Sequence, residues 1–267
     1  MASSAARGAR IELRGVGVTY AGGAVAVQNV DLDVAAGEFA VFLGPSGSGK
    51  STLLRTINRL IEPTAGAIFI DGVDVRTLDP VVLRRGIGYV IQAVGLFPHL
   101  TIGANVGVVP ALLGWDRARI AKRVDDLLAL VRLEPATYRD RYPRQLSGGE
   151  QQRAGVARAL AAEPPVLLMD EPFGAVDAIV RASLQDAIRR IHRDLGTTIV
   201  FVTHDVDEAL RLADRVVVIA AGGIAQAGSP SNVLAAPAND TVRALVGIDA
   251  ESRRFAETRP LLDRADG

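Results

Sequence analysis

Cysteine is absent from the 267 residues of this chain, and only two lysines occur among its 30 basic residues. Without cysteine the chain can form neither a disulfide nor a thiolate metal site. No uncharged apolar run approaches the roughly 18 residues that a membrane-spanning helix needs. The first ten residues, MASSAARGAR, also lack the apolar segment of a secretory signal peptide. We therefore expect a soluble protein without a leader.

An excess of either charge is missing as well. The 30 basic residues balance the 30 acidic residues, so the formal net charge is zero. A nucleic-acid-binding domain normally carries a basic excess, and we expect no nucleic-acid partner. Hydrophobic residues make up 49% of the chain, which is enough to build the core of one large domain or two small ones.

The most informative stretch that is present reads GPSGSGKST and follows the apolar run Phe39–Leu43. It matches the phosphate-binding P-loop pattern G-x-x-x-x-G-K-[ST]. Its glycines allow a tight turn whose backbone N–H groups point inward, and the helix that follows favours an anion at its N-terminus. Lys50 would reach the β- and γ-phosphates, and the Ser51 hydroxyl would hold Mg²⁺. The predicted nucleotide-binding residues are Gly44, Pro45, Ser46, Gly47, Ser48, Gly49, Lys50, Ser51 and Thr52. The alternative is a glycine-rich turn with an ordinary surface lysine.

The hydrophobic pattern predicts an α/β fold. The front of the chain is rich in β-structure, and buried strands then alternate with helices, which implies a mostly parallel sheet. Between them, about residues 93–162 are predicted to form a helical insert with breaks at prolines, including Pro110–Gly114. We expect the lone Trp115 to pack inside this insert. The core domain would span residues 10–247, followed by a charged, partly disordered tail over 248–267.

Two carboxylates end the apolar segment VLLMDE. At the end of a strand beside a P-loop, Asp170 can hold Mg²⁺ and Glu171 can polarise an attacking water. The alternative is a pair of solvated carboxylates, which would be preferred if the pair stood alone.

The segment LSGGEQQR predicts a helix start in which Ser147 and Glu150 form a capping box. Two glycines, Gly148 and Gly149, lie just inside this start, where each costs roughly 1 kcal/mol relative to alanine. They are understandable if backbone amides must approach a ligand closely, because a helix N-terminus favours an anion. The alternative is simply a well-capped helix.

In this order the three motifs strongly resemble the ATP-binding-cassette (ABC) ATPases, over roughly residues 11–247. LSGGQ-type sequences are the signature of that family, and Glu150 replaces its commonest glutamine. The resemblance implies a P-loop NTPase core with a mostly parallel sheet, an N-terminal antiparallel β subdomain and an inserted α-helical subdomain. It also implies ATP and Mg²⁺ as cofactors.

The resemblance assigns roles to four further residues. Tyr20 matches an aromatic that stacks on adenine, and Gln92 matches a glutamine that contacts Mg²⁺ and the attacking water. His204 matches a histidine that touches the γ-phosphate, and Asp177 matches an aspartate after the catalytic Glu171, although the loop around it departs from the commoner SALD. Without the resemblance, Tyr20 and His204 would be read as ordinary residues at strand ends.

The resemblance further implies a head-to-tail dimer in which Ser147–Gly149 of one subunit completes the P-loop site of the other. The second subunit would be another copy of this chain or a paralogous cassette. Integral-membrane permease subunits would be partners, with an extracytoplasmic substrate-binding protein acting indirectly. The protein would lie peripherally on the cytoplasmic face of the plasma membrane.

The segments Gly86–Val109, Leu112–Trp115 and Phe173–Asp177 resemble osmoprotectant importers for glycine betaine, carnitine or choline. Since the chain stops at Gly267, we expect no C-terminal CBS domains and no osmotic gating through them. The alternatives are an amino-acid importer ATPase and a soluble ABC ATPase without a transport role. A nucleotide-binding scaffold without hydrolysis is disfavoured because both Glu171 and His204 are present.

Overall fold

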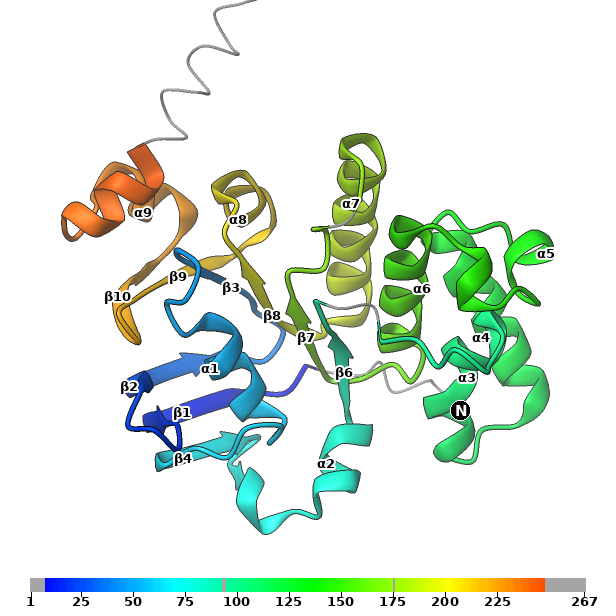
Figure 1. Ribbon diagram of the computed structural model, residues 1–267, viewed down its shortest axis with the longest axis horizontal. Helices are drawn as coiled ribbons and strands as arrows, with labels where there is room; N and C mark the ends of the chain where they lie inside the picture. Colours follow the sequence, from blue (N-terminus) through cyan, green and yellow to red (C-terminus); the bar gives the residue numbers. More distant parts are fainter. Residues whose placement is uncertain (1–7, 93–94, 175, 248–267) are drawn as a thin grey trace, which may run out of the picture.

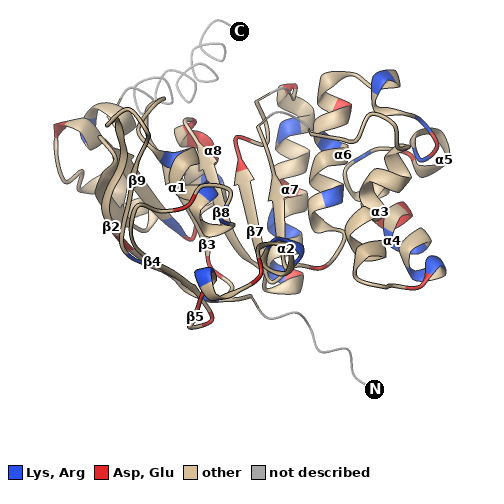
Figure 2. Ribbon diagram, turned by 60° about the horizontal axis from the view of Figure 1, so that its bottom comes forward, with Lys and Arg blue, Asp and Glu red and all other residues tan. Residues whose placement is uncertain are grey.

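The computed structural model describes residues 8–92, 95–174 and 176–247. Two sheets lie next to each other, and a group of helices extends from the edge of the larger sheet (Figure 1). Figure 2 shows the same division, with β2, β4 and β5 on one side of β7 and the helices α3 to α6 on the other. The predicted tail over 248–267 is outside the described residues.

The larger sheet has six strands in the order β10-β9-β3-β8-β7-β6. Its strands are β3 (Phe39–Leu43), β6 (Ile87–Val90), β7 (Val166–Asp170), β8 (Thr198–Thr203), β9 (Arg215–Ala220) and β10 (Gly223–Gly228). All neighbours pair in parallel except β10, which runs antiparallel to β9. Every residue of β3, β7 and β8 is buried, as expected for a parallel sheet covered on both faces. The predicted mostly parallel core is confirmed, while the edge strand β10 was not predicted.

The smaller sheet has four antiparallel strands in the order β2-β1-β4-β5. They are β1 (Ile11–Thr19), β2 (Val25–Val34), β4 (Ala65–Ile70) and β5 (Val73–Asp74). This sheet, helix α1 and one face of the larger sheet share a core that includes Ala40 and Phe42 of β3. Because side chains alternate along a strand, Phe39, Val41 and Leu43 belong to a second core on the other face. Strand β3 is therefore covered on both faces.

The labelled helices are α1 (Lys50–Ile57), α2 (Pro80–Arg85), α3 (Ile102–Leu112), α4 (Arg117–Leu130), α5 (Pro135–Tyr138), α6 (Gly148–Leu160), α7 (Ala178–Leu195), α8 (Val206–Leu212) and α9 (Pro230–Ala235), with short 3₁₀ helices η1 (Val75–Thr77) and η2 (Pro143–Gln145). Residues 240–247 are helical as well. Side-chain caps fix several of their starts, for example Asp116 before α4 and Asp205 before α8. Arginines lie along α6 and α7 (Figure 2).

Three local predictions differ from the structure. The break predicted over Pro110–Gly114 begins later than expected, because α3 continues through Pro110 and ends at Leu112. Pro110 removes one i→i−4 hydrogen bond, and the helix ends two residues later. Helix α2 was missed, although Asp79 followed by Pro80 is a typical helix start. Trp115 is only half-buried rather than packed inside the insert, and the Arg119 guanidinium lies 3.3 Å from its ring centroid.

Candidate functional site

The P-loop connects the end of β3 to the start of α1, and two of its glycines are required by close packing. A Cβ on Gly44 would lie 2.1 Å from the Ile219 carbonyl oxygen. Gly49 has a φ of +101°, and a Cβ there would lie 2.3 Å from the Ala26 carbonyl oxygen. A side chain at either position would displace a neighbouring strand, so these glycines hold the loop against the two sheets.

Lys50 is the first residue of α1 and is only 5% exposed. Its ammonium donates hydrogen bonds to the carbonyl oxygens of Gly44 and Pro45, both at 2.7 Å. Burial lowers the pKa of Lys50, while the charges of Glu171 and Asp170 oppose this effect. The structure thus holds a partly desolvated cation inside the loop, where a phosphate would offer it stronger acceptors.

Ser51 and Asp170 are brought together although 119 residues separate them in sequence. The Ser51 hydroxyl donates to Asp170 Oδ1 at 2.6 Å, and the Asp170 carboxylate is fully buried at the end of β7. A hydroxyl and a carboxylate oxygen are the hard donors that Mg²⁺ prefers. In the part of the chain that the structure describes, no group of three or more His, Cys, Asp or Glu residues could hold a metal. The residues present therefore fit Mg²⁺ that keeps waters and phosphate oxygens as its other ligands.

Glu171 connects the ends of three neighbouring strands. Its Oε2 accepts a hydrogen bond from Gln92 Nε2 at 3.3 Å, and its Oε1 lies 3.4 Å from His204 Nδ1. Gln92 follows β6, Glu171 follows β7 and His204 follows β8. The carboxyl ends of parallel strands are the usual location of a site in such sheets.

Glu171 also has an unusual backbone conformation, with a φ of +45°. A non-glycine residue in this region costs about 1–3 kcal/mol and persists where the surroundings enforce it. Here the Glu171 N–H donates to the Val202 carbonyl oxygen of β8 at 3.1 Å. This bond directs the carboxylate toward Gln92 and His204.

A cavity of about 420 Å³ opens over the P-loop. It is lined by Tyr20, Ala26, Ser46, Gly47, Ser48, Gly49, Lys50, Ser51, Thr52, Gln92 and Glu171. Tyr20 donates or accepts a hydrogen bond with the Thr52 hydroxyl at 3.0 Å, yet the residue remains 47% exposed. The volume is in the range of small-molecule and cofactor sites. An exposed aromatic ring beside a phosphate-binding loop is suited to stack on a nucleotide base.

The predicted signature residues Ser147, Gly148 and Gly149 do not line this cavity. Ser147 caps α6 by accepting from the Glu150 N–H at 3.3 Å, and the Glu150 carboxylate accepts from the Ser147 N–H at 2.7 Å. The predicted capping box is therefore confirmed. Gly148 is exposed, and a Cβ there would meet no atom of the described residues within 4 Å. Packing inside this chain gives no reason for glycine at this position.

Asp177 is likewise exposed and does not line the cavity. Its carboxylate caps α7 by accepting from the Val180 N–H at 3.0 Å. The exposed Ile179, at 80%, lies two residues further along. The structure thus gives Asp177 a local capping role and leaves it on the surface.

Two charged residues near the site were not predicted from the sequence. Arg55 donates from Nη2 to Asp170 Oδ2 at 3.0 Å, and Glu208 of α8 accepts from the Thr203 hydroxyl at 2.7 Å. The sequence could have predicted Arg55 near the site, because Arg55 follows Ser51 by four residues and so lies on the same face of α1. Glu208 had no comparable signal, since its burial depends on how α8 packs.

We expect Glu208→Gln to stabilise the protein at neutral and alkaline pH. Burial raises the pKa of Glu208, opposed by the hydrogen bond from Thr203. The folded state therefore favours the protonated acid, and stability is greatest below the unfolded-state pKa and declines as the pH rises through the folded-state pKa. An increase of about 1 kcal/mol in the free energy of unfolding would raise Tm by roughly 2–4 °C at pH 8 for a chain of this size.

Thermal unfolding across a pH series measures this effect. The difference between Glu208→Gln and wild type should shrink toward pH 4, whereas the exposed Glu134→Gln should follow the wild type throughout. A lower Tm for Glu208→Gln at pH 8 would show that the charged carboxylate is stabilising.

Comparisons with known proteins identify the family of this chain. The ABC transporter family profile matches residues 27–174. The chain is 53% identical over 256 residues to the glycine betaine/carnitine/choline transport ATP-binding protein OpuCA of Bacillus subtilis (strain 168), covering 96% of this chain and 66% of that protein. It therefore spans just under two thirds of that relative. It is 52% identical over 248 residues to the glycine betaine uptake system ATP-binding protein YehX of Escherichia coli (strain K12), covering 91% of this chain and 80% of that protein.

A solved structure gives the same result. The ATP-binding cassette MJ0796, solved as a dimer in a post-hydrolysis state bound to ADP and Pi, superposes with a TM-score of 0.76 at 34% identity. The match covers 82% of this chain and 98% of that cassette. Within the described residues no helix is long and apolar enough to cross a membrane. The predicted family and fold are confirmed: this chain belongs to the ABC transporter family as an ATP-binding cassette.

Proposed function

We propose that the chain is the ATP-hydrolysing subunit of an ABC importer and drives uptake through separate membrane subunits. The observation that carries this proposal is the P-loop cavity, where the Ser51–Asp170 pair and Glu171 meet at the carboxyl ends of parallel strands. This arrangement supplies a phosphate cradle, oxygen ligands for a divalent cation and a base in one place.

Each of these residues has a role in phosphoryl transfer that follows from its position. The backbone N–H groups of the residues that follow Pro45 in the loop bind the phosphates, and Lys50 exchanges its two carbonyl acceptors for β- and γ-phosphate oxygens. Glu171 accepts a proton from the attacking water, since its carboxylate faces the cavity and is held by Gln92 and His204. Tyr20 stacks on adenine.

Ser51, Asp170 and Gln92 would hold Mg²⁺ together with phosphate oxygens. Bound Mg²⁺ supplies charge neutralisation and orientation at the phosphates. The residues themselves position the reactants: the Gln92 amide lies beside Glu171, and the exposed His204 ring, whose Nδ1 lies 3.4 Å from Glu171 Oε1, would contact the γ-phosphate. Phosphoryl transfer needs mainly such positioning and charge stabilisation.

Two copies of the chain would form a head-to-tail dimer with ATP at each interface. Ser147–Gly149 provide a second anion-binding helix start outside the P-loop cavity, and they are open to a partner. The exposed Asp177 and Ile179 would contact the partner subunit. Binding of two ATP molecules closes the dimer, and hydrolysis reopens it.

We expect Gly148→Asp to abolish ATP-driven dimerisation while leaving the monomer folded. A carboxylate in the first turn of a helix is neutral or slightly stabilising, and Gly148 faces open space within the chain. In the proposed dimer this carboxylate would face the phosphates of the ATP bound to the partner subunit. The two negative groups would repel each other and so prevent dimerisation. Sedimentation with and without ATP measures the dimer, and Tm reports the fold.

The matched control for Gly148→Asp is Ala104→Asp, at an exposed position in the first turn of α3. It should dimerise and hydrolyse ATP like wild type. If Gly148→Asp dimerised normally with ATP, Ser147–Gly149 would not contact the ATP bound to the partner subunit.

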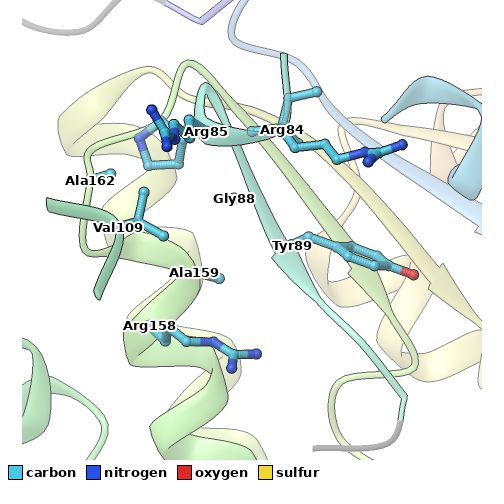
Figure 3. Close-up of a pocket in the computed structure, with 10 residues that line it drawn as sticks. Arg84, Arg85, Gly88, Tyr89, Val109, Arg158, Ala159 and Ala162 are labelled. Carbon is cyan, nitrogen blue, oxygen red and sulfur yellow. The ribbon is translucent and has the colours of Figure 1, made fainter. Parts of the chain in front are cut away.

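Permease subunits would dock at a groove between the larger sheet and the helical insert. This groove encloses about 180 Å³ (Figure 3). Arg84 and Arg85 end α2 just before β6, and Arg158 lines the same groove from α6 (Figure 3). Since β6 leads into Gln92, an occupant of the groove would act on the strand that positions a site residue. Three arginines favour an acidic docking segment.

The transported substrate would be a quaternary-amine osmoprotectant, namely glycine betaine, carnitine or choline. Support comes from the osmoprotectant transport proteins to which this chain is similar. The cassette would lie peripherally on the cytoplasmic face of the membrane, with an extracytoplasmic substrate-binding protein as an indirect partner.

Uptake of labelled betaine, choline and amino acids, with and without this subunit, tests the substrate. Deletion should lower only uptake of the quaternary amines, whereas a selective loss of amino-acid uptake would assign an amino-acid importer. Copurification with a polytopic membrane protein is expected. Full ATPase activity without any effect on uptake or any membrane partner would instead indicate a soluble ABC ATPase.

A further inference from the structure

The carboxylate of Asp170 is held at both oxygens by one helix. Oδ1 accepts from the Ser51 hydroxyl at 2.6 Å, and Oδ2 accepts from Arg55 Nη2 at 3.0 Å. Ser51 and Arg55 are four residues apart and therefore lie on the same face of α1. The Asp170 side chain is completely buried, whereas that of Arg55 is 38% exposed. The orientation of this carboxylate is thus set by the P-loop helix.

Arg55 is itself held from a third element. The hydroxyl of Tyr89, on β6, interacts with its guanidinium, and β6 pairs directly with β7, which carries Asp170. Figure 3 shows the Tyr89 hydroxyl pointing away from Val109 and Ala159, so it extends to the opposite side from the groove. Burial lowers the pKa of Arg55, but Tyr89 and Asp170 together outweigh this effect and leave it raised. Arg55 is a permanent cation fixed between the two strands.

The contact with Arg55 leaves the other oxygen of Asp170 directed at Ser51. The two predicted metal ligands, Ser51 and Asp170, therefore meet at Asp170 Oδ1. Asp170 Oδ2 accepts the hydrogen bond from Arg55. Ligating carboxylates are commonly oriented by such outer partners, whose removal typically weakens metal affinity by about 10- to 100-fold. A guanidinium also repels a divalent cation, which by itself would weaken metal binding. Orientation of the carboxylate by Arg55 would strengthen metal binding, whereas repulsion by its charge would weaken it. A measurement of metal affinity in an Arg55 variant therefore shows which effect is larger.

We propose that Arg55 is a positioning residue that orients Asp170 for the divalent cation, and that Tyr89 fixes Arg55. The proposal rests on the proposed binding of ATP with Mg²⁺ at this site. Arg55 would therefore affect the affinity for the metal and not the affinity for the nucleotide. Arg55 contacts Asp170 and Tyr89, and it does not line the P-loop cavity.

The test is the affinity for Mn²⁺, which is visible by electron paramagnetic resonance, in the presence of a non-hydrolysable ATP analogue. We expect Arg55→Gln to weaken Mn²⁺ binding by about 10- to 100-fold. Binding of the analogue in the absence of metal should remain at the wild-type level. Arg55→Lys keeps the charge and one donor and should restore part of the loss, and Tyr89→Phe should show a smaller loss than Arg55→Gln.

Arg211→Gln is the matched control. Arg211 pairs with Asp186 at 2.8 Å on the surface, and its loss should leave Mn²⁺ affinity unchanged. Unchanged or tighter Mn²⁺ binding by folded Arg55→Gln would overturn the proposal. If Arg55→Gln did not fold, wild-type affinity in both Arg55→Lys and Tyr89→Phe would overturn it equally. A wild-type protein that bound no Mn²⁺ with the analogue would instead contradict the proposed ATPase itself.

Discussion

Replacement of Glu171 by glutamine is expected to reduce ATP turnover by at least about 100-fold without weakening ATP binding. A positioned general base contributes about 10²–10⁴ in rate, and glutamine cannot accept the proton. Glutamine can keep the hydrogen bond with Gln92 if the amide groups turn, and it can adopt the same backbone φ of +45°. ATP should therefore bind and the dimer should close, but it should not reopen.

Steady-state hydrolysis and gel filtration with ATP measure the two parts of this result. Glu163→Gln is a close control, because Glu163 also has a positive φ, +53°, but pairs with Arg119 and Arg123 away from the P-loop cavity. It should hydrolyse ATP like wild type. Normal turnover in Glu171→Gln would remove Glu171 from the role of base.

Replacement of Lys50 by glutamine is expected to weaken ATP binding by roughly 10- to 100-fold. Hydrogen bonds to charged groups contribute about 1.5–3 kcal/mol, and Lys50 would form them with two phosphates. Turnover should fall further, by about 10²–10³, because the same ammonium stabilises charge that develops during transfer. Glutamine can still donate to the loop carbonyls that now accept from Lys50, so the fold should be retained.

The sequence contains only one other lysine, which makes a natural control. Lys122 forms an exposed ion pair with Asp126 at 2.7 Å on α4. Exposed pairs of this kind contribute at most about 0.5 kcal/mol, so Lys122→Gln should bind and hydrolyse ATP normally. Fluorescent-nucleotide titration and hydrolysis assays compare the two variants. Equal ATP affinity in Lys50→Gln and wild type would contradict the assignment of the P-loop.

The sequence by itself determined the features that depend on local chemistry. The glycines of the P-loop, the capping box at Ser147 and Glu150, and the continuous apolar runs of β3, β7 and β8 each have a pattern that a short window contains. Together they predicted the α/β fold, and the order of the motifs along the chain carried the resemblance to the family.

The tertiary structure decided how distant residues meet. Ser51 and Asp170 lie 119 residues apart, and the Gln92–Glu171 contact spans 79 residues. No local pattern contains such contacts, because they arise only when parallel strands align their carboxyl ends. The positive φ of Glu171 also depends on its bond to β8, a strand that follows later in the chain.

The same reason explains what the sequence did not predict. Pro110 remains inside α3, and Trp115 is only half-buried with Arg119 over its ring, since each outcome depends on neighbours in space. Arg55 is an unremarkable residue of the P-loop helix until β7 places Asp170 beside it and β6 adds Tyr89. Local chemistry therefore predicted which residues would bind phosphate, whereas the packing of α1 beside β7 and β6 decided how the Asp170 carboxylate is held.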